Sequence, residues 1–149
     1  MTPHFTLAEL TVTDHRLLDN TPNAGEIENL RRLATFLELV KERLGGRPIM
    51  INSAYRSKAV NDAVGSKDTS QHRVGCAADI RVPGMTPDAV VRAVRASGLA
   101  YDQLIKEFDS WTHISIPNLA TAAPRKMALI IDKQGTRLFP VDPARLAAG

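Results

Sequence analysis

Three side chains that could bind a metal ion lie at wide intervals in this sequence, namely His72, Asp79 and His113. Imidazole nitrogen and carboxylate oxygen suit Zn²⁺, and three protein ligands leave one coordination position open for water. An open position is typical of a catalytic zinc site rather than of a closed structural one. Spacing alone also permits the alternative that both histidines are ordinary packed or surface side chains. The first hypothesis is therefore a zinc site built from these three residues.

The other histidines and the cysteine have simpler interpretations. His4 and His15 lie near the N-terminus with no matching carboxylate pattern, so we expect them to be structural or solvent-facing. Cys76 is the only cysteine, which excludes an intramolecular disulfide. It lies three residues before Asp79, and side chains alternate between the faces of a strand. We therefore expect Cys76 in the core, on the face opposite Asp79.

Helices are predicted from apolar periodicity and capping signals. The segment 23–44 places its apolar residues on one helical stripe and stops at two glycines. A capping box of Thr6 and Glu9 predicts a helix start at 5–10. Two further helices are predicted at 57–64 and at 86–98, the second beginning with Thr-Pro-Asp.

Strands are predicted between these helices, and they are expected to hold two of the candidate ligands. Asp79 lies on the predicted strand 76–82 and His113 on 111–116, whereas His72 lies in the polar, irregular segment 66–74. Other strands are predicted at 48–53, 102–107, 127–131 and 136–139. Helices and hairpins in runs, rather than in strict alternation, favour an α+β domain with a mainly antiparallel sheet flanked by helices.

Composition narrows the class of protein. The chain has 149 residues, 44% hydrophobic and 23% charged, which predicts one globular domain over 1–149. The net charge of +3 is small, and the basic residues are scattered among acidic ones. Nucleic acid is therefore not an expected partner, whereas a weak excess of positive charge is compatible with binding to an anionic cell wall. No apolar run is long enough to span a membrane. The N-terminus lacks a secretory signal, so we expect synthesis in the cytoplasm. We also expect a monomer.

A sequence motif connects the candidate ligands to a known family. Ser70-x-His72-x-x-Gly75-x-Ala77-x-Asp79 fills every fixed position of SxHxxGxAxD, and Trp111-x-His113 follows later. The stretch 53–57 resembles an SGYRS element, with alanine in place of glycine. Over about 5–116 the chain thus resembles the zinc D-Ala-D-Ala carboxypeptidase-like murein peptidases, including compact phage and prophage members. The fold expected from this resemblance is that shared with the Hedgehog domain, and the predicted hairpin at about 127–139 lies outside the motif-bearing part.

The resemblance implies roles for individual residues. The three candidate ligands would bind Zn²⁺. Arg56 would polarise the scissile carbonyl or hold a substrate carboxylate, since its planar fork suits both. Ser70 would orient its loop or contact the substrate, and Trp111 would contact the substrate.

The general base is left open between two acids. Many relatives carry an acidic residue three positions before the last histidine, where this chain has Ser110, whose hydroxyl cannot accept a proton near neutral pH. If 108–110 is a three-residue loop, Glu107 faces Trp111 and shares the sheet face of His113. A two-residue loop would turn Glu107 to the other face and favour Asp109. The resemblance of 103–107 to a QLIxE element favours Glu107.

The implied function is zinc-dependent hydrolysis of a peptide bond in the peptidoglycan stem peptide, of the D,D-carboxypeptidase or endopeptidase type. Phage or prophage cell-wall lysis, after release from the cytoplasm, is the expected setting. The main alternative is a non-catalytic zinc domain that binds cell wall or a protein. Two others are a virion component and a cytoplasmic dipeptidase acting on free D-Ala-D-Ala.

Overall fold

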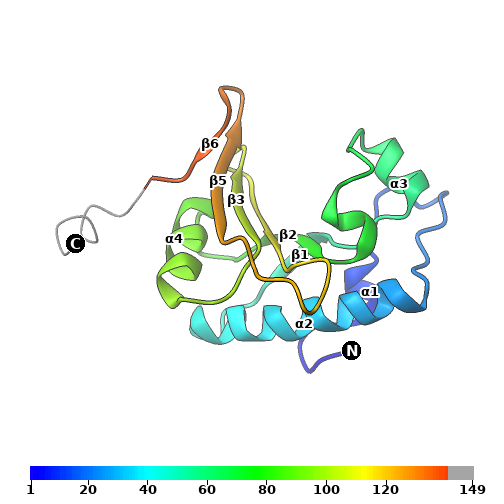
Figure 1. Cartoon of the computed structure of the whole chain (residues 1–149), viewed down its shortest axis with the longest axis horizontal. Coiled ribbons are helices and arrows are strands. Elements are labelled where there is room, and N and C mark those ends of the chain that lie inside the picture. The colour runs from blue at the N-terminus through cyan, green and yellow to red at the C-terminus, as the bar shows by residue number, and fades with distance from the viewer. Residues whose placement is uncertain (141–149) are drawn as a thin grey trace.

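A six-stranded sheet occupies the centre of the computed structural model, which describes residues 1–140 (Figure 1). Its order is β1-β2-β4-β3-β5-β6, and every neighbouring pair is antiparallel except β3 and β5. This confirms the predicted α+β class with a mainly antiparallel sheet. The strands are β1 (Met50–Ser53), β2 (Ala77–Arg81), β3 (Gln103–Glu107), β4 (Trp111–Ser115), β5 (Met127–Asp132) and β6 (Gly135–Leu138).

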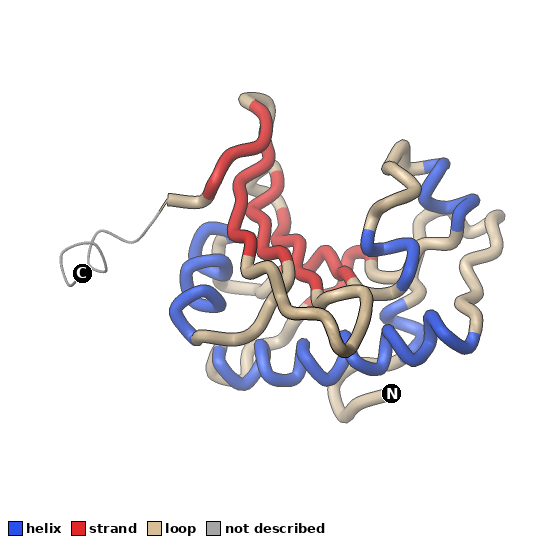
Figure 2. Tube along the Cα trace, in the orientation of Figure 1, coloured by secondary structure: helices blue, strands red, loops and turns tan. Residues whose placement is uncertain are grey.

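Two long helices, α2 (Ala24–Arg43) and α4 (Pro87–Ser97), cover one side of this sheet (Figures 1 and 2). Both begin where the sequence predicts, because Asn23 and Thr86 accept hydrogen bonds from backbone N–H groups of the first turn. The short helices are α1 (Leu7–Leu10), α3 (Lys58–Ala63) and the 3₁₀ helix η1 (Gln71–Val74). None of the helices within residues 1–140 is both long and apolar enough to cross a membrane.

The core lies between the sheet and these two helices. Alternate strand residues Ala78, Ile80, Leu104 and Ile114 are fully buried there. They share one hydrophobic cluster with α2 and α4, and each fully buried Leu or Ile stabilises the fold by about 1.5–3 kcal/mol. Cys76 is fully buried in the same cluster, as predicted. The strand residues between the core positions must face the other side of the sheet.

The β3–β4 turn decides which side chains share that other side. Glu107 pairs with Trp111, and Ile105 pairs with His113, so three residues form the loop. The N–H of Ser110 donates to the carbonyl of Glu107 at 2.9 Å. The loop length therefore places Glu107 on the same face as Trp111 and His113, the first of the two predicted alternatives.

The last hairpin extends the sheet. β5 and β6 form the predicted antiparallel hairpin through a tight turn. The parallel pairing of β5 with β3 was not predicted. Phe139 is buried in the main hydrophobic cluster, which ties the hairpin to the core. The main hydrophobic cluster thus includes residues from Phe5 to Phe139, whereas residues 141–149 of the predicted domain lie outside the described part of the chain.

Candidate metal centre

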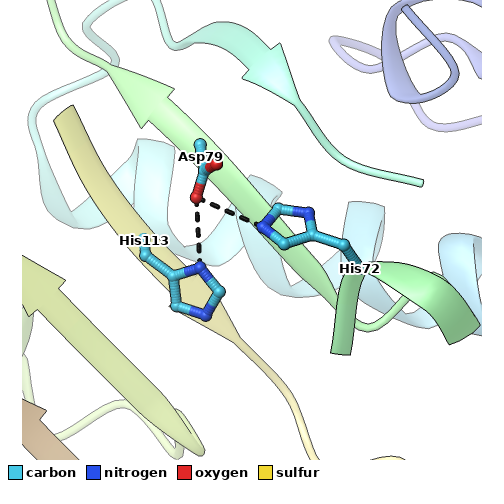
Figure 3. Close-up of side chains that lie close together, drawn as sticks. All are labelled: His72, Asp79 and His113. Carbon is cyan, nitrogen blue, oxygen red and sulfur yellow. Dashed lines mark hydrogen bonds and ion pairs between the residues drawn. The ribbon is translucent and has the colours of Figure 1, made fainter. Parts of the chain in front are cut away.

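The three candidate ligands meet on the sheet face opposite the core (Figure 3). Asp79 on β2 is the direct cross-strand partner of His113 on β4, and η1 brings His72 to the same place. Asp79 Oδ1 lies 3.1 Å from His113 Nδ1 and 3.3 Å from His72 Nε2. One ligating atom from each residue lies within 4.8 Å of the others, and all three residues are buried.

The spacing of these atoms fits a zinc ion. Bonds of about 2.0–2.2 Å in tetrahedral geometry place neighbouring ligand atoms about 3.3–3.6 Å apart. The two separations from Asp79 Oδ1, 3.1 and 3.3 Å, lie just below this range and at its lower end. Two imidazole nitrogens and one carboxylate oxygen also form a donor set that Zn²⁺ prefers, with room for a further ligand. The residues therefore fit a zinc ion with one open position.

His72 is held by its own short helix. The sequence predicts an irregular loop here, whereas the structure has η1, in which the Ser70 hydroxyl accepts a hydrogen bond from the His72 N–H. Gly75 ends η1 at φ 81°, and a Cβ at this position would lie 2.9 Å from the carbonyl of Glu26. His72 Nδ1 lies 2.6 Å from the carbonyl oxygen of Ala54. Because a carbonyl only accepts, Nδ1 carries the proton and Nε2 is free to bind a metal.

His113 is oriented by a residue that the sequence did not single out as part of the site. Its Nε2 lies 3.2 Å from Gln103 Oε1, while its Nδ1 faces Asp79. When Gln103 accepts from Nε2–H, the lone pair of Nδ1 points toward the other two ligands. The signal in the sequence was the spacing of Gln103 and Glu107, which places both on one face of β3.

We expect Gln103→Leu to weaken zinc binding about 10- to 100-fold, because removing the partner of a metal-binding histidine usually has an effect of that size. Competition with a chromophoric chelator measures the dissociation constant. Gln134→Leu is the matched control, since Gln134 is an exposed residue in the β5–β6 turn. Unchanged zinc affinity in Gln103→Leu would show that Gln103 does not orient His113.

Burial and the contacts between neighbouring residues together set the charges of the centre. Although burial opposes ionisation, the adjacent His72 and His113 hold the pKa of Asp79 well below its usual range. Burial lowers the pKa of His72, and Asp79 offsets this only in part. Asp79 is thus a carboxylate and His72 a neutral imidazole, which are the protonation states that metal ligands need.

Arg56 lies directly beside the ligands, with its guanidinium bonded on all sides. Its terminal nitrogen NH2 is 3.2 Å from Asp79 Oδ2, and its other two nitrogens donate to Ser53 Oγ and Asn61 Oδ1. The side chain is only 13% exposed. Asn61, fully buried, was not identified from the sequence, where nothing distinguished it from other residues of a short helix. Arg56 therefore orients Asp79 and keeps a positive charge beside the centre.

Of the two candidate bases, only Glu107 lies on a strand, where it shares the sheet face of the candidate ligands. Glu107 is partly buried, and this burial together with the charge of Asp79 raises its pKa, while His113 partly offsets the shift. Asp109 instead lies in the turn, with 72% of its side chain exposed and its carboxylate 3.8 Å from Lys106. A raised pKa suits a carboxylate that must accept a proton near neutral pH.

The remaining predicted residues lie around the centre in different ways. Trp111 lines a groove of about 490 Å³ that also reaches Asp79. Ser70 is partly buried and caps η1, which corresponds to the predicted role in orienting the loop. His4 pairs with Glu38 at 2.7 Å and His15 is exposed, so neither joins the centre.

Comparison with models of protein families places the candidate ligands in a known family. A family model described as Peptidase M15 matches residues 3–115, which include all three candidate ligands. Comparison with curated proteins gives no match.

Proposed function

The chain belongs to the peptidase M15 family, a family of metallopeptidases, and from this premise we propose that it is a zinc enzyme that hydrolyses a peptide bond in the peptidoglycan stem peptide. The observation that carries the proposal is the buried His72, Asp79 and His113 cluster, whose spacing fits Zn²⁺. A D,D-carboxypeptidase or endopeptidase acting in phage-type wall lysis is the specific form that the resemblance supports.

Each residue of the centre has a distinct part in the proposed reaction. A bound Zn²⁺ supplies a Lewis acid for the scissile carbonyl and lowers the pKa of water. Glu107 accepts the proton of the attacking water and returns it to the leaving amine. Arg56, held at Asp79, keeps a positive charge beside the centre, which would stabilise the negative charge that develops on the carbonyl oxygen. Because Glu107 is partly buried and its pKa is raised, it can accept this proton near neutral pH.

The proposal is tested by measuring bound metal and hydrolysis on the same preparation. We expect one zinc per chain, and we expect release of new amino groups from purified peptidoglycan that stops when a chelator removes the metal. Mass spectrometry of the fragments then identifies the bond. One zinc without cleavage of any wall type would contradict the enzyme and favour a non-catalytic zinc domain. A protein that binds no zinc would contradict the site itself.

A further inference from the structure

A groove of about 490 Å³ opens beside Asp79, on the sheet face that carries the metal ligands. β2 contributes Asp79 and Arg81 to this groove, and the loop between α1 and α2 contributes Asp14. Because Arg81 follows Asp79 by two residues, the two side chains leave the same face of the strand. The groove therefore joins the metal centre to two charged residues of opposite sign, Arg81 and Asp14.

Arg81 presents a free guanidinium edge to this groove. Its Nε donates to the carbonyl of Ser110 at 3.0 Å, which anchors one side of the fork. Its two terminal nitrogens make no hydrogen bond or ion pair with any of residues 1–140. The two terminal nitrogens of a guanidinium anchored through Nε can donate one hydrogen bond each to the two oxygens of a carboxylate.

Arg56 is far less suited to holding a substrate carboxylate. All three of its nitrogens already donate within the protein, one of them to the metal ligand Asp79. Breaking these bonds would leave buried polar groups unpaired, which is costly. Compared with Arg56, Arg81 is therefore the arginine more available to a substrate anion.

Asp14 faces the same groove with its charge unpaired. Within the described chain its carboxylate has no hydrogen bond or ion pair, and it does not pair with Arg81. Apart from the metal ligand Asp79, the other residues that line the groove are uncharged. A ligand in the groove would thus meet one cation and one anion that the protein leaves unpaired.

We propose that Arg81 and Asp14 form a subsite for a substrate residue whose side chain ends in a free amino-acid group, with its carboxylate on Arg81 and its ammonium on Asp14. A diamino-dicarboxylic acid residue within a peptide has this chemistry. The inference rests on the proposed peptidase function, because it takes the groove beside the metal centre as the place where the peptide binds.

Binding to a zinc-loaded Glu107→Gln protein tests the subsite without turnover. Three synthetic stem tetrapeptides serve as probes: one with the free diamino-dicarboxylic residue, one with its side-chain carboxyl amidated, and one with its side-chain amine acetylated. Isothermal titration gives each dissociation constant, and mass spectrometry checks that the peptides stay intact. Arg81→Gln and Asp14→Asn are added separately, with Arg31→Gln as control because Arg31 is an exposed residue of α2.

We expect the free peptide to bind about tenfold more tightly than either blocked peptide, the size of one charge-assisted contact. Arg81→Gln should remove the preference over the amidated peptide, and Asp14→Asn the preference over the acetylated one. Equal binding of the three peptides, preferences that survive both substitutions, or no binding at all would each overturn the subsite. Cleavage of peptidoglycan by the wild-type protein would still support the proposed function in those cases, so the two failures are distinguishable.

Discussion

His113→Ala is expected to lose bound zinc and hydrolytic activity together. His113 is one of the three proposed ligands, and its Nδ1 lies 3.1 Å from Asp79 Oδ1 in the buried centre. Removing a residue that merely orients a ligand already weakens metal binding about 10- to 100-fold, so we expect a loss of more than about 100-fold here. The zinc-to-protein ratio after gel filtration and amine release from peptidoglycan measure the two effects.

The control for this experiment is His4→Ala. His4 is an exposed histidine that pairs with Glu38 and lies outside the metal centre. We expect its variant to keep zinc and activity. A cooperative thermal transition shows whether His113→Ala still folds. The same measurement with added zinc shows whether the metal binds, because a metal that binds only the folded state raises its stability. Full zinc occupancy in a folded His113→Ala protein would rule out His113 as a ligand.

Glu107→Gln is expected to lower kcat by about 10²- to 10⁴-fold while zinc stays bound. Glutamine has nearly the same shape but cannot act as a base, so the substitution removes the proposed base and leaves the three proposed ligands in place. Burial and the charge of Asp79 raise the pKa of Glu107. As the pH is lowered, wild-type activity should therefore begin to fall at a pH above the ordinary pKa of glutamate, because the base becomes protonated there. Rates on peptidoglycan from pH 4 to 9, together with zinc content, check both expectations.

Asp109→Asn is the matched control for the base. Asp109 lies in the same turn, but its carboxylate is exposed and contacts Lys106 rather than a metal ligand. We expect this variant to keep its activity. The opposite pattern, an active Glu107→Gln and an inactive Asp109→Asn, would transfer the role of base to Asp109.

The sequence predicts the parts of this molecule that depend on local signals. Capping residues such as Asn23 and Thr86 locate the helix starts because their side chains bond the next turn directly. The strands that carry Asp79 and His113 follow from short apolar runs. A four-residue helix such as η1 has too few residues for a periodic pattern, which is why the segment around His72 was expected to be irregular.

Features that depend on the pairing of distant segments could not be predicted in the same way. The contact between Gln103 and His113 exists only because β3 and β4 pair in one register. The hydrogen bond of Arg56 to Asp79 joins residues 23 positions apart, whereas its bonds to Ser53 and Asn61 are local. The sequence left the length of the β3–β4 loop open because Phe108 and Asp109 adopt positive φ angles, 50° and 53°, that residues other than glycine rarely adopt.

The pairing of β3 with β4 also restricts how this region can change during evolution. Leu104 and Ile114 pair with each other and are both fully buried. A slip of one strand against the other by a single residue would turn one of them away from the core, and with it the polar side chains of that strand on the opposite face. Residues added within the loop leave this register unchanged. Among related chains, the length of the loop should therefore vary more readily than the pairing of apolar residues at positions 104 and 114.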